Sequence, residues 1–269
     1  MKGEMLMFFE EIAAVMNSSR LKTDFLKRNP IGYFLATILA GVFVGFGILL
    51  IFTIGGMLEG QPYVKIVMGL SFGIALSLVI IAGAELFTGN NFVMTVGALG
   101  KTVSWPETLK LWMVCFLGNW LGAIILALIF QGTGLTKGAT GEFIAAASAV
   151  KMNMALLPLF TRAILCNMLV CLAIWSGFRC KSESGKLIMV FWCLFAFITS
   201  GYEHSVANMT LLTVSILSPL SSDISITGYF YNIFVVSLGN MIGAIAGLAV
   251  PYYMISRNQE AKASQNQEA

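Results

Sequence analysis

The chain has 269 residues, of which 58% are hydrophobic and 11% are charged. This composition is too apolar for a water-soluble domain of that length, and the formal net charge of +3 is too small a bias to indicate a nucleic-acid partner. The apolar residues fall in runs long enough to cross about 30 Å of hydrocarbon as helices, rather than in the short alternating segments of a membrane barrel. We therefore predict an all-α integral membrane protein whose main solvent is the lipid bilayer.

Residues 1–30 precede the first long apolar run. Phe8, Ile12 and Val15 recur at helical spacing, whereas Glu10 and Glu11 interrupt the apolar stretch that a cleavable signal peptide would need. The pattern predicts a cytoplasmic amphipathic helix within residues 1–30.

Six apolar spans follow within residues 31–256, which we expect to form one transmembrane domain. Their expected ranges are 31–55, 64–87, 109–130, 157–178, 187–216 and 228–254. Residues 257–269 are polar and are expected to form a disordered cytoplasmic tail.

The basic residues are divided unequally between the two sides of the membrane. When the six spans alternate in direction, twelve lysines and arginines fall on the side of the termini and four on the opposite side. The four are Lys65, Lys137, Lys151 and Arg162. Because cytoplasmic loops carry an excess of Lys and Arg, both termini are predicted to be cytoplasmic.

An internal repeat relates the two halves of the chain. At span two the chain has Gly83, Glu85 and Asn90, and at span five it has Gly201, Glu203 and Asn208 at the same spacing. Span three contains Leu117, Gly118 and Asn119, and span six contains the same three residue types as Leu238, Gly239 and Asn240. Each half holds three spans, so the second half must enter the membrane from the opposite side. The sequence thus predicts two inverted three-helix repeats, an architecture typical of transport proteins.

Spans two and five each contain a glutamate followed by a polar stretch, which predicts a broken helix. A carboxylate facing lipid would cost about 2.5–3.5 kcal/mol, so Glu85 and Glu203 should face protein or a water-filled cavity. We expect both carboxylates to shape the pore by accepting backbone N–H bonds at the break rather than to bind substrate. The half-helix that begins after each break would present N–H groups and a positive dipole end, which favour an anion near the membrane centre.

The chemistry-bearing side chains at the breaks are His204 and Thr88. His204 is the only histidine in the chain, and with an unperturbed pKa near ~6.5 it can donate a hydrogen bond to a passing anion. The alternative is a buried imidazole with a purely structural role. Thr88 occupies the equivalent break; it either faces His204 across a pore or bonds its own helix.

Other classes of function find little support in these residues. A single histidine excludes a metal motif of the H-E-x-x-H type, and we expect no metal and no cofactor. Ser205 beside His204 lacks a supporting catalytic motif, so an intramembrane enzyme is the weaker alternative, and a receptor role would leave the paired breaks unexplained.

The loops at both breaks resemble the signature loops of the formate/nitrite transporter family. The resemblance rests on the segments 84–90 (AELFTGN) and 201–209 (GYEHSVANM), with further similarity in span four around Cys166, Asn167 and Trp175. It implies an aquaporin-like helical fold, a homopentamer with a pore in each subunit, and the cell membrane of a prokaryote.

The resemblance also assigns roles to individual residues. It implies that Thr88 and His204 form a central polar pair, that Lys151 lies in an outer vestibule, and that Asn167 and Asn208 lie beside the pore. The implied constrictions are Phe72 and Phe197 on one side of the pair, and Leu76, Leu86, Phe87 and Val170 on the other. Judged from composition alone, these six would be ordinary core or lipid-facing side chains, and Lys151 an ordinary solvated lysine.

The first loop bears on the substrate. The run from Glu85 to Gly89 resembles that of nitrite and hydrosulfide members more than that of formate members, so nitrite ranks first, then hydrosulfide, then formate. We expect Lys151 to attract the anion, a collar to strip its water, and His204 with Thr88 to bind it where desolvation costs most. Proton transfer from His204 would couple transport to proton flow, or the pore could be gated by pH.

Overall fold

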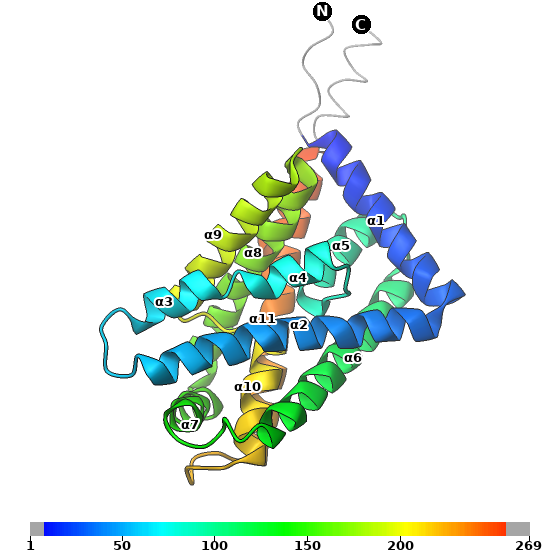
Figure 1. Cartoon of the computed structure of the whole chain (residues 1–269). Helices are drawn as coiled ribbons and strands as arrows, with labels where there is room; N and C mark the ends of the chain where they lie inside the picture. Colours follow the sequence, from blue (N-terminus) through cyan, green and yellow to red (C-terminus); the bar gives the residue numbers. More distant parts are fainter. Residues whose placement is uncertain (1–7, 257–269) are drawn as a thin grey trace, which may run out of the picture.

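The computed structural model describes residues 8–256, and all regular elements in that range are helical (Figure 1). The predicted tail 257–269 lies outside the described residues. The helices are α1 Phe9–Arg28, α2 Pro30–Met57, α3 Val64–Ser71, α4 Ile74–Ile81, α5 Phe87–Leu99, α6 Trp105–Gly132, α7 Ala139–Met152, α8 Leu156–Arg179, α9 Glu183–Thr199, α10 Ser205–Leu217 and α11 Ile226–Ala244, which continues through the π-helical segment η1 Ile245–Ala249.

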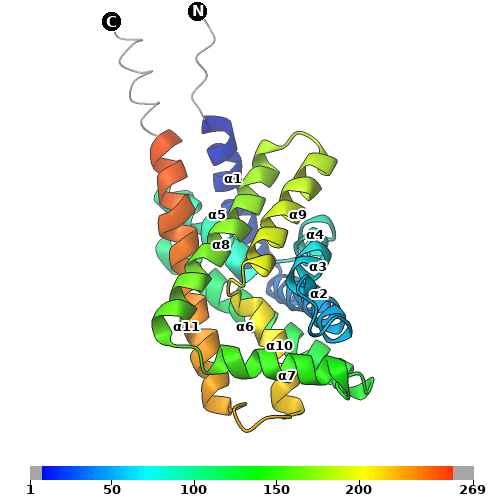
Figure 2. The same cartoon turned by 90° about the vertical axis from the view of Figure 1, so that its left-hand side faces the viewer.

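The order of helices matches the predicted repeat. In the first half α2 packs on α6, and in the second half α8 packs on α11. The peripheral helices α1 and α7 pack on the half-helices α5 and α10, respectively, and lie at opposite ends of the molecule in both views (Figures 1 and 2). This opposite placement is what an inverted repeat requires.

Both predicted breaks are present. The chain leaves α4 at Ile81 and resumes as α5 at Phe87, and it leaves α9 at Thr199 and resumes as α10 at Ser205. Gly83 and Gly201 have φ angles of +78° and +73°, a backbone conformation that glycine adopts without steric cost. The recurring glycines of the sequence repeat therefore supply the positive-φ residue in the turn at each break.

The breaks change the predicted span boundaries. Within residues 8–256, five stretches are long and apolar enough to cross a membrane: Pro30–Met57, Val64–Ile81, Trp105–Gly132, Leu156–Arg179 and Ile226–Ser256. The predicted range 187–216 is divided between α9 and α10, and the half-helix α5 extends beyond the predicted range 64–87. In addition, Lys151 belongs to helix α7, in a segment that the sequence assigned to a linker.

Small residues bring the long helices into close contact. A Cβ added at Gly41 of α2 would lie 2.1 Å from the backbone oxygen of Asn119 in α6, and one added at Gly243 of α11 would lie 2.3 Å from that of Ile164 in α8. Such close approach of backbones is the usual role of small residues in membrane helices.

The N-terminal helix α1 is held by its buried face. Ile12 and Val15 are buried against α5, and Lys27 forms an ion pair with Glu107 of α6. The hydrogen bond that Lys27 donates to the Glu107 carboxylate raises the pKa of Lys27 above its ordinary value. A second surface ion pair joins Glu11 to Arg179 of α8, so apolar burial and surface ion pairs together place α1 across the ends of the transmembrane helices.

Candidate functional site

The two half-helices bring Thr88 and His204 together. Thr88 lies in the first turn of α5 and His204 immediately precedes α10, and both side chains are buried. Thr88 Oγ1 lies 3.0 Å from His204 Nε2. Two residues that are 116 positions apart in sequence thus form one polar contact at the centre of the bundle.

His204 also caps α10. Its Nδ1 atom accepts a hydrogen bond from the backbone N–H of Ala207 at 3.1 Å, so the single proton of the neutral ring resides on Nε2. That N–H points at Thr88. The ring also stacks on Phe197, with centroids 5.9 Å apart, which fixes its plane.

Asn119 and Asn240 hold the two loops in shape. Asn119 Oδ1 accepts from the N–H of Phe87 at 2.8 Å, and its Nδ2 donates to the carbonyls of Glu85 and Thr37. Asn240 makes the equivalent bonds to the N–H of Ser205 and to the carbonyls of Glu203 and Ala163. The sequence repeat had already paired these asparagines, but their function was missed.

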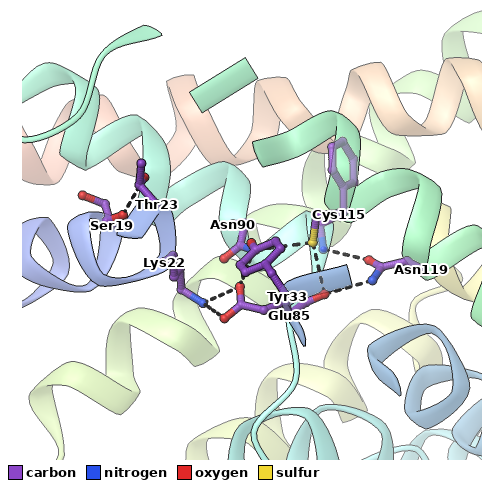
Figure 3. A network of polar contacts seen from close by, with 9 residues as sticks. Ser19, Lys22, Thr23, Tyr33, Glu85, Asn90, Cys115 and Asn119 are labelled. Atoms are coloured by element: carbon purple, nitrogen blue, oxygen red, sulfur yellow. Dashed lines mark hydrogen bonds and ion pairs between the residues drawn. The ribbon is translucent and has the colours of Figure 1, made fainter. Parts of the chain in front are cut away.

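Glu85 is bound by side chains (Figure 3). Its carboxylate accepts from Lys22 Nζ at 2.7 Å to each oxygen, from Asn90 Nδ2 at 2.8 Å and from the Tyr33 hydroxyl at 3.1 Å. The Cys115 thiol donates to the backbone carbonyl of Glu85. Lys22 comes from α1, so this network joins the peripheral helix to the first break.

Glu203 has an equivalent set of partners. Lys151 Nζ of α7 donates to both carboxylate oxygens at 2.7 Å, and Asn208 Nδ2 donates at 2.7 Å. Asn208 is held in turn by Asn232. Lys151 is therefore engaged in an ion pair and is not a solvated lysine.

These partners correct the expected role of the glutamates. We expected both carboxylates to accept backbone N–H groups, but the hydrogen bonds they accept come from lysine, asparagine and tyrosine side chains. The backbone N–H at the start of each half-helix is bound by Asn119 or Asn240 instead. Lys22 could have been found from the sequence only by searching α1 for a counterpart of Lys151.

Two cavities approach the polar pair from opposite ends. The α7-side vestibule, of about 280 Å³, is lined by residues of α2, α3, α7, α9 and α10, including Lys65, Lys151, His204 and Asn208. The α1-side vestibule, of about 540 Å³, is lined by residues of α1, α4, α5, α8 and α9, including Lys22, Glu85, Asn90 and Lys186. Between them lies a space of only about 10 Å³.

The central space is lined by the apolar residues that close the path, together with His204. The lining residues are Val44, Phe72, Ala75, Leu76, Leu86, Val170, Leu194, Phe197 and His204. Phe72 and Phe197 meet edge to face with centroids 5.5 Å apart. The structure thus gathers five of the six expected constriction residues here, and adds Val44 and Leu194, whose apolar character gave no signal in sequence.

Three expected pore residues line none of these three cavities: Thr88, Phe87 and Asn167. Thr88 nevertheless contacts His204, which lines two of them. Phe87 packs edge to face on Phe116 of α6, with centroids 5.2 Å apart, and does not line the central space. Asn167 is fully buried and donates to the carbonyls of Thr88 and Asn240. It therefore positions the backbone of Thr88 from behind.

Metal binding finds no support among residues 8–256, where no group of three or more His, Cys, Asp or Glu side chains is arranged to hold an ion. All five cysteines are free thiols, and four of them are buried: Cys115, Cys166, Cys171 and Cys193. The groups that the site presents to a ligand are the Thr88–His204 pair and the ion pairs of Glu85 and Glu203 with lysines.

Known proteins resemble this chain over nearly its whole length. The family profile described as formate/nitrite transporter matches residues 10–254. The nitrite transporter NirC of Salmonella typhimurium is 39% identical over 234 residues, with 86% of each chain covered. A solved FNT family ion channel has a TM-score of 0.87 at 36% identity, covering 91% of this chain and 98% of that one. A pentameric formate channel with formate bound has a TM-score of 0.74 at 29% identity, covering 83% and 96%.

Proposed function

Because the chain belongs to the formate/nitrite transporter family, we propose that it conducts small monovalent weak-acid anions, nitrite foremost, through a pore within each subunit of a homopentamer. It is a multi-pass membrane transport protein, not an enzyme, as its relatives are transporters and channels. Similarity to a nitrite transporter supports nitrite, and similarity to a pentameric formate channel supports the pentamer. Hydrosulfide and formate are the alternative substrates within the same site chemistry.

The observation that carries this proposal is the contact between Thr88 and His204 at the closed centre of two facing vestibules. An anion entering an apolar constriction loses its hydration, which is expensive unless hydrogen bonds replace the water. The Thr88 hydroxyl and the His204 Nε2–H are donors at this point. One N–H group at the start of each half-helix, that of Phe87 or Ser205, is already bound by an asparagine, and we assign the direct binding to the Thr88 and His204 side chains.

The orientation in the membrane follows from the basic residues. The α1 side carries the predicted majority of lysines and arginines, so we assign it to the cytoplasm of a prokaryotic cell, with both termini. The α7-side vestibule then opens to the outside. Anions from outside would meet His204 before they enter the central space, since this residue lines both the α7-side vestibule and the central space.

The cap geometry defines how His204 can respond to protons. The neutral ring donates from Nε2, and it would become an unstable anion if it gave up that proton. Proton transfer to the substrate therefore requires a doubly protonated ring, which cannot accept the Ala207 N–H bond. Protonation of His204 is thus coupled to loss of the α10 cap, which gives pH gating and proton-linked transport a common structural origin.

The test is stopped-flow uptake of nitrite, hydrosulfide and formate into proteoliposomes at two pH values. We expect saturable flux that is fastest for nitrite and changes with pH. His204→Asn is the informative variant, because asparagine also caps helices and donates a hydrogen bond but does not titrate.

The comparison with His204→Ala separates the roles of this residue. His204→Asn should retain flux, and its only remaining pH dependence should be the one that protonation of nitrite to nitrous acid causes. His204→Ala should lose most of the flux. Unchanged pH dependence in His204→Asn would refute proton linkage at this residue. Absence of flux of all three anions in the unmodified protein would overturn the transport proposal for these substrates.

A further inference from the structure

The paired charges in the α7-side vestibule leave one cation uncompensated. Lys151 and Glu203 form a close ion pair with both carboxylate oxygens engaged, so together they contribute almost no net charge. A neutral pair exerts a field that falls off quickly with distance, and it therefore attracts a distant anion weakly.

Lys65 is the other lysine that lines this vestibule. It lies in the first turn of α3 and is solvent-exposed. Among the described residues no carboxylate is within ion-pair distance of its ammonium group. The acidic residues expected on the same side, Glu59, Glu142 and Asp223, do not line the vestibule.

The α1-side vestibule differs in this respect. Its two lining lysines, Lys22 and Lys186, are both in ion pairs, with Glu85 and Glu183. The vestibule at one end of the path is therefore electrically balanced by local pairs, while the vestibule at the other end carries a net positive charge near its rim.

We propose that Lys65 is an anion-capture residue, which makes the α7-side mouth the side of higher apparent affinity. This inference rests on the proposed function. Lys151 then serves chiefly to hold Glu203 and the second break in place, and the long-range attraction expected of it falls to Lys65. An exposed charge acts mainly on encounter, so the effect belongs to KM and not to the maximal rate.

The expected size follows from Coulomb's law. An anion passing about 8 Å from the ammonium group in water would gain roughly a two- to threefold increase in local concentration, and reversal of the charge would double the exponent. Lys65→Gln should therefore lower uptake at subsaturating nitrite about two- to threefold, and Lys65→Glu about sixfold, at an ionic strength of about 10 mM. At about 0.3 M most of the difference should vanish.

The experiment compares nitrite uptake in right-side-out and inside-out membrane vesicles at low and high ionic strength. Lys137→Glu is the matched control, because Lys137 is an exposed lysine assigned to the same side that does not line the vestibule. We expect Lys65→Glu to raise KM only when nitrite enters from the α7 side, with the saturated rate unchanged, and Lys137→Glu to behave as the unmodified protein.

The other outcomes refute either the capture role of Lys65 or the proposed function, and they are distinguishable. Equal KM values for Lys65→Glu and the unmodified protein would refute the capture role, as would an effect of equal size from Lys137→Glu. A fall in the saturated rate from both sides would indicate a structural effect and also refute it. Absence of flux in the unmodified protein would instead refute the proposed function.

Discussion

Replacement of Asn119 by leucine should destabilise the protein far more than the same replacement at Asn91. Both asparagines are fully buried, but they differ in hydrogen bonding. Asn119 makes three bonds to the backbone of other segments, of which the bond to the Glu85 carbonyl can be followed in Figure 3. The amide oxygen and nitrogen of Asn91 have no partner in residues 8–256.

The magnitude follows from what each substitution leaves behind. Asn119→Leu removes three hydrogen bonds and leaves the Phe87 N–H buried without an acceptor, whereas the Glu85 carbonyl keeps the Cys115 thiol. With about 1 kcal/mol for each of the two bonds to carbonyls and about 1–3 kcal/mol for the orphaned N–H, the expected loss is roughly 3–5 kcal/mol. Asn91→Leu replaces a desolvated, unpaired amide with an apolar side chain, so we expect no loss, or a gain of up to about 2 kcal/mol.

The assay is thermal unfolding of the detergent-solubilised protein, followed by intrinsic tryptophan fluorescence. A change of 1 kcal/mol shifts Tm by about 2–4 °C in chains of this size, so Asn119→Leu should lower Tm by at least about 6 °C relative to Asn91→Leu. The comparison uses the same pair of residue types in both variants. Equal Tm values would refute the assignment of Asn119 as the residue that holds the first break.

Two further predictions concern the ion pair and the helix contacts. Lys151→Met should leave the Glu203 carboxylate without a cation and lower the free energy of unfolding by about 3 kcal/mol. The double variant Lys151→Met, Glu203→Gln should recover most of that loss. A double variant with a Tm no higher than that of Lys151→Met would contradict the pairing. Gly41→Ala should lower Tm because its Cβ would meet a backbone oxygen of α6 at 2.1 Å. The control is Gly132→Ala, whose Cβ meets nothing within 4 Å and which should leave Tm within about 2 °C of the unmodified protein. Similar Tm values for the two variants would contradict close packing of α2 on α6.

Much of the site could be predicted because the chain carries it twice. The repeated glutamates and asparagines marked both breaks, and the order of motifs placed Thr88 at one break and His204 at the equivalent one. The sequence left open whether Thr88 faces His204 or bonds its own helix, and the structure shows a contact of 3.0 Å between the two side chains. The inverted repeat predicted only that the two breaks bracket one central site.

The errors concern side chains whose role depends on helix rotation. Phe87 was expected to narrow the pore but packs on Phe116, and Asn167 was expected beside the pore but supports the backbone of Thr88. Val44 and Leu194 line the central space but have the same apolar character as their neighbours in sequence. In a helix that is apolar on all faces, hydrophobic periodicity does not identify the face that points to the pore.

The sequence was sufficient to predict the long apolar segments, the breaks in two helices, and Thr88 and His204 as the polar residues at those breaks. It could do so because a membrane core offers no water, so apolar run lengths and isolated polar turns directly fix which backbone segments are helical. Only the tertiary structure decided the partners: Lys22 for Glu85, Asn119 for the first break, and Lys65 as a cation without a local counter-charge. These depend on how closely helices distant in sequence approach and how each is rotated, and no local pattern of residues encodes either quantity.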